Sequence, residues 1–577
     1  MTQFIQRQAD ETAVATLVAA GFKRPLAVAL ASRGIASAGD MAPDWKRLLP
    51  PESLEGAAQA ACRMADAIEA QEKIVIVADY DCDGATACAL AVRALKSFGC
   101  ENVEYVVPER LTEGYGLSRE IVENLLKIKP GLLVTVDNGI QSFDGIACAR
   151  ENGIDVIVTD HHLAGEALPE GCIIVNPNAP GSAFASKALC GVGVIFYVML
   201  ALRQELRARG VFTPEHQPRL DTLVDLVALG TVADVVSLDA NNRLLVDFGL
   251  KRIQSGRTHP GIAALFEVAG RPLAHASARE LAFSIAPRIN AAGRLNLMNV
   301  GIECLITDNP EFAFEKAREL EAFNNERRQI ESDMQFDANA ILNATDTTAR
   351  ASLVLFSERW HQGVVGLIAS RIKDARYKPT IAFAPAEGDE LRGSGRSIPG
   401  VHLRDLLEKL DADFPNLIIK YGGHSMACGL SVARDRLEAF SQAFEATVRK
   451  YCQADSFEKR IVVDAPIQAD EITRELVEDI RSINWGQGFE EPLFANEFKV
   501  VSQTLLRSGH MKLRLQLDGR FFPAIFFRHD TQLPLYAKLA YRPEINRFMG
   551  RNELQLVIEG IESPAPAPGG EKLRDAP

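Results

Sequence analysis

The sequence lacks any run of about 18 or more apolar residues, so no membrane-spanning helix is expected. Its first ten residues are polar and do not resemble a secretory signal peptide. The ten cysteines include no CxxC pair and no regular spacing, which argues against a disulfide framework or a zinc ribbon. Together these absences predict a cytoplasmic protein with reduced thiols.

A surplus of basic residues is also missing. The chain has 63 Lys and Arg against 76 Asp and Glu, which gives a net charge of −13. A protein that coats DNA nonspecifically is basic, so any contact with nucleic acid would use local patches. The excess of acid suits a protein that gathers carboxylates around divalent metal ions.

Two catalytic signatures are absent as well. The sequence contains neither a P-loop nor a Gly-x-Ser-x-Gly nucleophile elbow. Their absence favours hydrolysis by metal-activated water over a covalent intermediate on a side chain.

The most informative segment that is present runs from Val77 to Gly84. Asp79, Asp81 and Asp83 lie between the apolar run Ile74–Ile76, a predicted buried strand, and a predicted helix that follows Gly84. Three carboxylates at alternating positions repel one another unless a cation holds them. The alternative is a polar turn with an acidic helix start.

Further acids and histidines also follow apolar runs. They are Asp137, the triplet Asp160-His161-His162, and Asp234 within Leu229–Val236. Taken singly, either histidine could be a hydrogen-bonded turn residue and Asp234 a solvated loop acid. Because ligands bind at the carboxyl ends of parallel strands, we expect these side chains to meet at one sheet edge. Carboxylates with imidazole suit Mn²⁺.

The length of 577 residues predicts about three to four domains. Residues 1 to about 70 look helical, with a break near Leu49–Pro51. Apolar runs separated by helix-length segments then predict a parallel sheet. Its expected strands are Val103–Val107, Leu132–Val136, Val156–Thr159 and Ile173–Val175.

A long helix is expected from Glu311 to about Asn343, because no Gly or Pro interrupts this segment. A second α/β block follows. Its expected strands are Leu353–Phe356, Thr380–Phe383 and Leu417–Ile419. Polar alternation in Met511–Leu517 and Phe521–Phe527 predicts a small β-barrel.

Four segments together resemble the motifs of the DHH phosphoesterases. They are Asp79-Tyr-Asp-Cys-Asp83, Asp137-Asn-Gly139, Asp160-His-His162 and Gly230-Thr-Val-Ala-Asp234. Four more segments are similar to the branch of this family that degrades single-stranded DNA. They are Pro108–Ser118, Pro287–Arg294, Trp360–Gly366 and Gly422–Gly429. The resemblance covers about residues 50 to 560.

The resemblance implies an α/β fold with two α/β domains, DHH and DHH-associated, joined by a long helix and followed by an OB-like β-barrel. The expected parts are an N-terminal helical segment (1–50), the DHH domain with the metal centre (51–309), the connecting helix (310–345), the DHH-associated domain (346–455), the OB-fold (456–562) and a disordered tail (563–577).

The resemblance also implies a centre of two Mn²⁺ ions, with Mg²⁺ as the alternative. The expected metal ligands are Asp79, Asp81, Asp83, Asp137, His161 and Asp234, with Asp137 bridging both ions. The expected catalytic set is Asp81, Asp83, Asp137, His161 and His162, with His162 positioning its neighbours or contacting phosphate. Which acid of the first motif serves which ion stays open, because many relatives begin this motif with His where this chain has Asp79.

Substrate contacts are expected in two glycine-rich loops, Gly393–Ser397 and Gly422–His424, whose backbone N–H groups can approach phosphate. The resemblance assigns recognition of the 5′ end to Ser394 and Arg396. Ordinary turns between elements are the alternative. The full set of expected substrate-binding residues is Arg110, Arg288, Arg294, Ser394, Arg396, Gly422, Gly423 and His424. For Asn324–Arg328, a solvated helix face and a DNA contact are equally good interpretations.

The C-terminal block has five aromatic residues among its predicted strands, Phe521, Phe522, Phe526, Phe527 and Tyr541. Most aromatics that alternate along barrel strands are core, so only a minority should stack on bases.

The expected function is therefore 5′→3′ hydrolysis of single-stranded DNA in repair and recombination. A phosphatase or short-oligonucleotide phosphodiesterase of the same family is the alternative, and the strand-binding barrel argues against it. An inactive nucleic-acid scaffold is a third interpretation, which the complete set of acids disfavours. The expected partners are single-stranded DNA, a single-stranded-DNA-binding protein and a recombination helicase, with the chain itself a monomer away from any membrane.

Overall fold

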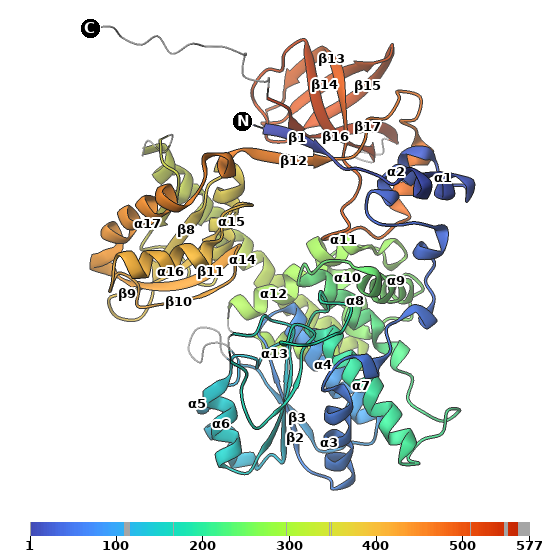
Figure 1. Cartoon of the computed structure of the whole chain (residues 1–577), viewed down its shortest axis with the longest axis vertical. Coiled ribbons are helices and arrows are strands. Elements are labelled where there is room, and N and C mark those ends of the chain that lie inside the picture. Colours follow the sequence, from blue (N-terminus) through green and yellow to red (C-terminus); the bar gives the residue numbers. More distant parts are fainter. Residues whose placement is uncertain are drawn as a thin grey trace.

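The computed structural model describes residues 2–108, 116–165, 167–295, 297–344, 347, 349–507, 509–546 and 552–563. Arg110 and the predicted disordered tail after Ser563 lie outside these residues. Figure 1 shows two α/β bodies, a C-terminal β-barrel and an N-terminal segment that runs between the barrel and the first body. The predicted fold class is confirmed by this arrangement. None of the described helices is long and apolar enough to cross a membrane.

The first body is built on a parallel five-stranded sheet with the order β3-β2-β4-β5-β6. Its strands are β2 (Ile74–Ala78), β3 (Val103–Val106), β4 (Leu132–Val136), β5 (Asp155–Thr159) and β6 (Ile173–Val175). Each residue of β2 and of β4 is buried, as expected of apolar strands covered on both faces. The helices between and beside them are α3 (Ala57–Glu69), α4 (Cys82–Ser97), α5 (Arg119–Leu125) and α6 (Phe143–Glu151).

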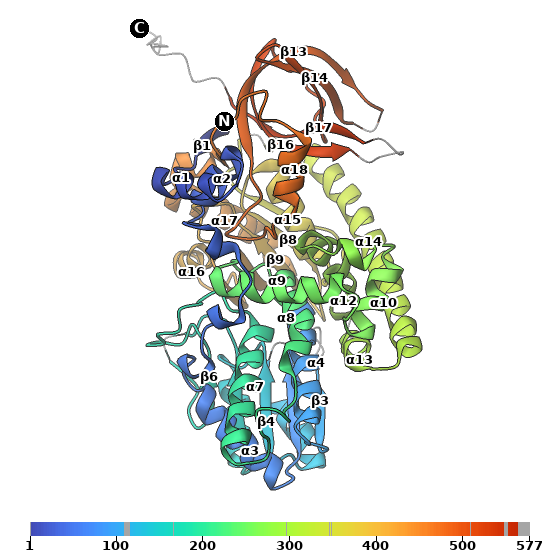
Figure 2. The ribbon, with the colours of Figure 1, turned by 90° about the vertical axis from the view of Figure 1, so that its right-hand side faces the viewer.

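A helical layer completes this body above the carboxyl ends of the strands (Figures 1 and 2). α7 (Gly191–Ala208) lies beside the sheet with α3 and α4. The helices of the layer are α8 (Val224–Ala233), α9 (Ala240–Gln254), α10 (Pro260–Val268), α11 (Ala278–Glu280), a π-helical turn (Leu281–Ile285), α12 (Ala286–Arg294) and α13 (Met298–Ile306). Because α7 and α8 both pack on α4, they bring their ends close to the acids that follow β2.

The connecting helix is α14 (Pro310–Ala344), close to its expected bounds. Its first half buries Ala313, Ala317 and Leu320 against the first body, and its second half buries Met334 and other apolar residues in the core of the second. Glu331 near the middle is buried and pairs with Arg327 on the same helix and with Arg371 of the second body. The helix therefore fixes the spacing of the two bodies.

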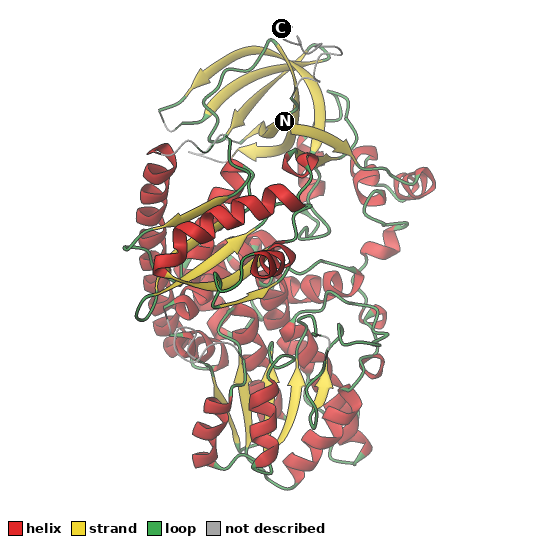
Figure 3. Ribbon diagram, turned by 60° about the vertical axis from the view of Figure 1, so that its left-hand side comes forward, coloured by secondary structure: helices red, strands yellow, loops and turns green. Residues whose placement is uncertain are grey.

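The second body has a mixed five-stranded sheet with the order β10-β11-β9-β8-β7. Its strands are β7 (Leu353–Phe356), β8 (Thr380–Pro385), β9 (Glu390–Arg396), β10 (Lys420–Gly423) and β11 (Ala427–Ala433), and its helices are α15 (Val365–Arg376), α16 (Leu403–Asp413) and α17 (Leu437–Tyr451). The predicted strand Leu417–Ile419 was wrong, because the strand begins at Lys420, where pairing with β11 starts. Figure 3 shows the helices beside this sheet.

The C-terminal body is a closed barrel with the order β13-β14-β15-β17-β16. Its strands are β13 (Phe494–Leu505), β14 (Met511–Leu517), β15 (Arg520–Phe526), β16 (Tyr536–Asn546) and β17 (Glu553–Ile561), preceded by α18 (Arg474–Arg481). Phe522 and Tyr541 are core residues, whereas Phe521 and Phe527 are half exposed.

The N-terminal segment differs from the expectation that it is helical throughout. It begins with a strand, β1 (Thr2–Gln6), before α1 (Glu11–Ala19) and α2 (Arg24–Ala31). β1 pairs in parallel with β12 (Lys459–Val463), which links the second body to the barrel. The partner strand lies more than 450 residues along the chain, so no local pattern could reveal the pairing.

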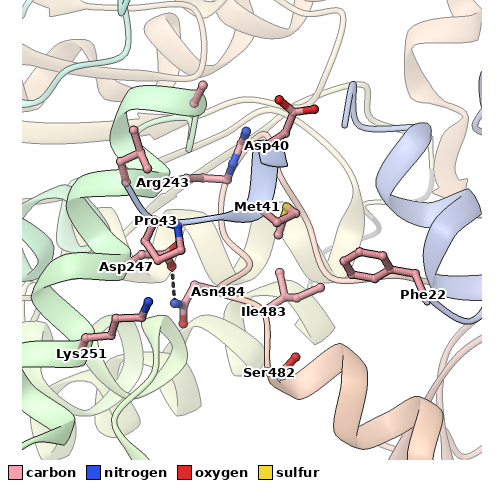
Figure 4. A pocket seen from close by; sticks show the side chains of 12 residues that line it. Phe22, Asp40, Met41, Pro43, Arg243, Asp247, Lys251, Ser482, Ile483 and Asn484 are labelled. Atoms are coloured by element: carbon pink, nitrogen blue, oxygen red, sulfur yellow. Dashed lines mark hydrogen bonds between the residues drawn. The ribbon is translucent and has the colours of Figure 1, made fainter. Parts of the chain in front are cut away.

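The N-terminal segment also closes the junction between the barrel and the first body. Figure 4 shows Phe22, Met41 and Pro43 of this segment around a cavity that α9 and the Ser482–Asn484 loop complete. Asn484 donates a 2.5 Å hydrogen bond to Asp247 of α9 across it. The three parts are therefore tied together at a distance from the metal ligands predicted in the first body.

Short 3₁₀ turns occur between these elements. They are Ala38–Met41, Trp45–Arg47, Pro51–Ser53, Leu126–Ile128, Leu220–Leu223, Leu273–His275, Arg434–Arg436 and Ala454–Phe457.

Candidate metal centre

The first acidic motif is shaped by the start of α4. Asp81 is the N-cap residue, and its carboxylate accepts hydrogen bonds from the N–H groups of Asp83 (2.9 Å) and Gly84 (3.1 Å). A Cβ at Gly84 would lie 2.5 Å from the carbonyl oxygen of Asp79, so the turn requires glycine there. This turn holds the carboxylates of Asp79, Asp81 and Asp83 close to one another.

Asp137 follows β4 in a left-handed conformation, with a φ of 63°. The amide of Asn138 donates to the carbonyl oxygens of Val77 (3.0 Å) and Val136 (2.9 Å), which ties this turn to the end of β2. Gly139 has a φ of 116°, which a side chain would strain. The conformation after β4 therefore directs the side chain of Asp137 toward the first acidic motif.

The three residues after β5, Asp160, His161 and His162, make different contacts. Asp160 is buried and accepts hydrogen bonds from the N–H groups of Ile140, His161 and His162 and from Nδ1 of His162 (2.8 Å). His161 points the other way. Its Nε2 is buried and lies 3.1 Å from Asp137 Oδ1, 3.5 Å from Asp234 Oδ2 and 4.0 Å from Asp83 Oδ2.

Asp234 lies beside His161 as well, but it follows a helix and not a strand. The prediction that it follows a strand was wrong, because it is the C-terminal cap residue of α8. A mostly apolar segment fits a buried helix as well as a strand, and here the helix packs on α4 and α7. Its position next to His161 nevertheless matches the expected ligand.

All six predicted metal ligands converge. Three groups of side chains each bring one ligand atom per residue within 4.8 Å of the others. The groups are Asp79 with Asp81 and Asp137, Asp83 with His161 and Asp234, and Asp137 with His161 and His162. Carboxylates combined with imidazole fit Mn²⁺ or Mg²⁺, and Asp137 occurs in two groups, as a bridging ligand would.

Without a bound cation, the carboxyl groups of this cluster have raised pKa values. Burial, followed by the charge of Asp81, raises the pKa of Asp83 to about 7. Burial and the charges of Asp83 and Asp81 raise the pKa values of Asp137 and Asp234 well above the usual range. A cluster of this kind favours divalent cations, which offset both the burial and the repulsion.

The two histidines are poised differently. Burial and the neighbouring His162 lower the pKa of His161 to about 3, so its ring is neutral and suited to a metal. Burial alone would lower the pKa of His162, but the hydrogen bond and charge of Asp160 raise it to about 9. His162 is therefore a cation at neutral pH, suited to contact a phosphate.

Part of the second body faces this cluster. The rings of His162 and His424 lie 6.4 Å apart and nearly parallel. Arg294 at the end of α12 donates a hydrogen bond to the carbonyl oxygen of Gly363 (3.1 Å), which joins the two bodies beside the metal ligands. His424 therefore lies beside His162, its role in substrate binding stays a prediction, and Arg294 bridges the bodies.

The glycine-rich segments are strands, contrary to the prediction of loops. Ser394 and Arg396 lie on β9, and Gly422 and Gly423 lie on β10. A Cβ at Gly393 would meet the ring of Phe383 at 2.4 Å, so glycine serves packing there.

Arg396 and Ser394 form a polar pair beside the start of α15. Arg396 Nη1 donates to Ser394 Oγ (2.9 Å), and a Cβ at Gly366 would lie 2.9 Å from Arg396 Nη2. The guanidinium therefore lies against the first turn of α15.

Arg288 is the predicted substrate residue with the least support. It is buried, its Nε lies 2.5 Å from Glu321 of α14, and it donates to the carbonyl oxygen of Ser284. These contacts hold α12 against α14, which is a structural role.

Sequence reasoning missed several residues that hold the ligands. Asn138 orients Asp137, and Asn290 of α12 accepts the N–H of Cys82 (2.8 Å). Gly191 and Val192 at the start of α7 donate to Asp83 at 2.6 and 2.9 Å. The glycines in Cys190–Gly193 were the available signal, because two glycines at a helix start indicate close approach by another group.

Comparisons with known proteins agree with this geometry. The DHH family, N-terminal domain, matches residues 73–231, the DHHA1 domain matches residues 349–450, and the RecJ OB domain matches residues 463–560. The single-stranded-DNA-specific exonuclease RecJ of Escherichia coli is 44% identical over 572 residues, which are 97% of this chain and 99% of that protein. The same-named protein of Haemophilus influenzae is 44% identical and covers 90% of this chain and 92% of its own.

Solved structures show the same similarity. The crystal structure of RecJ in complex with Mn²⁺ from Thermus thermophilus has a TM-score of 0.82 and 28% identity, covering 98% of this chain and 79% of that one. A crystal structure of exonuclease RecJ bound to manganese has a TM-score of 0.59 and 34% identity, over 70% of this chain and 96% of that one.

Proposed function

Because the chain belongs to the RecJ family of DHH phosphoesterases, we propose that it is a metal-dependent exonuclease that degrades single-stranded DNA from the 5′ end. The observation that carries this proposal is the convergence of Asp83, Asp137, His161 and Asp234 at one point. We place the activity in DNA repair and recombination.

The ligands define what the centre does. Asp79, Asp81, Asp83, Asp137, His161 and Asp234 would hold two divalent ions, and Asp160 holds the His162 ring in place. Such ions would supply an activated water and offset the charge that develops on the phosphate. The imidazolium of His162 and the ring of His424 face each other, where they can contact a phosphate oxygen.

The second body supports recognition of the 5′ end. Ser394 Oγ and the Arg396 guanidinium lie together against the first turn of α15. A guanidinium holds phosphate through paired hydrogen bonds, and the N–H groups at a helix start favour anions. A terminal phosphate held here would leave the first phosphodiester near the metals, which gives 5′→3′ polarity.

The barrel supports a grip on the strand farther from the metals. Its outer face across β13, β14 and β15 has a groove lined by Ser502, Thr504, Lys512, Arg514, Phe521 and Pro523. The guanidinium of Arg514 lies 4.6 Å from the ring centre of Phe521. An exposed aromatic beside cations is the arrangement on which OB-folds stack bases.

Partners and location form a further part of the proposal. A helicase would supply single strands from duplex DNA, and a single-stranded-DNA-binding protein would cover them, so we propose both as partners. We also propose that the chain is a monomer and that it works in the cytoplasm, where its ten free cysteines would stay reduced. Sedimentation of the pure protein checks the monomer, and degradation of duplex DNA with added helicase checks that partnership.

One assay tests the central proposal. The purified protein with Mn²⁺ should degrade 5′-labelled single strands, leave blunt duplex intact, and lose activity in excess chelator. Asp137→Ala should abolish hydrolysis without unfolding the protein, and Asp144→Ala on α6 is the control. Full activity in chelator, or faster cleavage of a dinucleotide than of a long strand, would contradict it and favour the small-substrate alternative.

A further inference from the structure

The start of α7 is occupied by an acid from another part of the chain. The N–H of Gly191 donates to Asp83 Oδ2 at 2.6 Å, and the N–H of Val192 donates to Asp83 Oδ1 at 2.9 Å. The first turn of α7 has no acidic residue of its own. Because the first N–H groups of a helix lack partners within it and favour negative charge, Asp83 takes the place of a cap.

Glycines let the backbone reach the acids. A Cβ added at Gly191 would lie 2.5 Å from both Cβ and Oδ1 of Asp137. A Cβ added at Gly230 of α8 would lie 2.7 Å from Asp83 Oδ1. Real Cβ atoms do not approach other atoms this closely, so α7 and α8 touch the two acids at positions where only glycine fits.

The start of α7 is itself tied down. Cys190, which precedes the helix, has its Sγ 3.3 Å from Thr231 Oγ1 of α8. Thr231 lies three residues before Asp234, so one contact couples the helix start to the end of α8 that carries another predicted ligand. The donors to Asp83 are therefore held in place by the body of the protein.

From these contacts we infer that the first turn of α7 is a positioning element of the metal centre. The N–H groups of Gly191 and Val192 orient the Asp83 carboxylate toward the site that it would form with His161 and Asp234, and Gly191 leaves room for Asp137. This inference rests on the metal centre of the proposed function.

The physical reasons are orientation and charge. An ionised carboxylate has about four lone-pair positions, so two backbone hydrogen bonds leave positions for an ion. The start of a helix carries about half a positive charge, which attracts the Asp83 carboxylate to the N–H groups of Gly191 and Val192. Outer partners of metal ligands are typically worth about 10–100-fold in metal affinity.

A pair of backbone substitutions isolates these hydrogen bonds. Val192 and Val194 are each replaced by α-hydroxyisovaleric acid, which removes one N–H and keeps the side chain. The N–H of Val194 donates within the helix to Cys190 (2.9 Å) and serves as the control. Titration calorimetry should show one of two Mn²⁺ binding events about 10–100-fold weaker in the Val192 protein and both unchanged in the Val194 protein.

Side-chain substitutions test the glycine. Gly191→Ala should weaken the binding of both Mn²⁺ ions, because its Cβ would displace Asp137, which belongs to two ligand groups. The variant should also lose the electron paramagnetic resonance signature of a coupled Mn²⁺ pair. Gly193→Ala is the control, since the atoms nearest to its Cβ would belong to the side chain of Leu189 and not to an acid of the site. If Gly191→Ala fails to fold, the Val192 and Val194 proteins still decide the question.

Equal Mn²⁺ affinity in the Val192 and Val194 proteins would overturn the inference, whether both are weakened or both are normal. Because the readout is metal binding, the inference is separable from the proposed nuclease. A protein that binds two Mn²⁺ in this way and degrades no DNA would refute the function and leave the positioning role intact.

Discussion

Arg396 shows how one side chain can set the preference for a strand end. Its guanidinium lies beside Ser394 Oγ and the first turn of α15, in a place that Gly366 keeps open. A hydrogen bond to a charged group contributes about 1.5–3 kcal/mol. Arg396→Ala should therefore lower kcat/KM on 5′-phosphorylated strands about 10–100-fold, and much less on 5′-hydroxyl strands.

Steady-state kinetics on the two kinds of strand measures this difference. Arg449→Ala, an exposed arginine of the same body paired with Glu445, should leave both rates unchanged. An equal loss on both strands would mean that Arg396 contacts an internal phosphate.

Asp225 illustrates a buried, hydrogen-bonded carboxylate that serves stability. Its carboxylate accepts from Thr258 Oγ1 (2.7 Å), from the N–H of His259 (2.9 Å) and from His259 Nδ1 (2.9 Å). Burial would raise the pKa of Asp225, but these contacts lower it below its usual value. Because the pKa of Asp225 is lower in the folded than in the unfolded protein, its carboxylate adds to the free energy of unfolding at pH values above about 3.9, the usual pKa of an unfolded Asp. That contribution is lost as the pH falls through the folded-state pKa.

Asp225→Asn should therefore lower the free energy of unfolding by about 3–5 kcal/mol at pH 7 and by clearly less at pH 3. Urea unfolding at both pH values measures it. The control is Asp221→Asn, whose carboxylate pairs with an exposed arginine and should cost less than about 1 kcal/mol. A loss that is the same at both pH values would contradict the assignment.

At the scale of elements, the outer face of β14 and β15 is the part of the barrel best suited to bases. Phe521 is 49% exposed and lies under the guanidinium of Arg514. Losing one stacked base costs about 1–3 kcal/mol, so Phe521→Ala should weaken binding of long single strands about 5- to 150-fold. Arg514→Ala should also make the plot of log binding constant against log salt concentration less steep, by about 0.7 in slope, because one phosphate contact is lost.

Fluorescence anisotropy over a range of salt concentrations gives both numbers. Phe336→Ala provides a matched control, because Phe336 is 76% exposed and belongs to α14, not to the barrel. If both phenylalanine variants bind alike, the face of β14 and β15 does not hold the strand.

Much of the element list was predictable because the strands of the first body are short, apolar and followed by acids. Leu132–Val136 and Ile173–Val175 have the predicted bounds, and α14 differs from its predicted bounds by about one residue. The metal ligands were predictable for the same reason, since parallel strands end at one edge. Asp234 was expected after a strand but lies at the end of α8, and its carboxylate still lies beside His161.

The remaining features depend on contacts between distant segments. β1 is a strand only because β12 pairs with it, and the contact of Gly191 with Asp83 spans more than 100 residues. The glycines of β9 looked like a loop because their sequence does not show that Phe383 and Leu403 fill the space above them. Arg288 looked like a phosphate ligand because nothing local reveals its partner Glu321.

At the scale of the whole molecule, Arg33 and Asp464 join the N-terminal segment to the barrel. Their Nη1 and Oδ1 atoms lie 2.6 Å apart, and both side chains are 2% exposed. Asp464 also accepts the N–H of Leu493 (2.9 Å). Removing one partner of a buried pair typically costs about 3–5 kcal/mol, so Arg33→Ala should loosen the barrel from the other bodies.

Limited proteolysis should then cut the linker around β12 faster in Arg33→Ala than in the unaltered protein. Arg7→Ala is the control, because its pair with Glu490 is partly exposed and worth little. The same rate of cleavage in both variants would show that the Arg33 pair does not secure the barrel. Cleavage of a very short oligonucleotide at saturation should persist, since every predicted metal ligand precedes Val235.

The same contacts make deletion a poor test of the barrel. A chain that ends near Lys450 would lose β12, Asp464 and the barrel residues that share a core with the first body. It would leave Arg33 buried without its partner and β1 without a neighbour. Point substitutions on the exposed face of the barrel therefore distinguish an effect on DNA binding from an effect on folding, whereas truncation affects both.

The pairing of β1 with β12 also orders events on the ribosome. The first strand must wait until about residue 463 has left the exit tunnel before it can find its partner. At roughly 5–20 residues per second, that delay is on the order of 20–90 seconds. The acids and histidines around the metals are complete by Asp234, so the hydrolytic centre can form well before the N-terminal segment docks. Ribosome-bound chains of increasing length should therefore bind Mn²⁺ while their first 50 residues are still cut by protease, and protection of those residues before β12 emerges would show that they dock by another route.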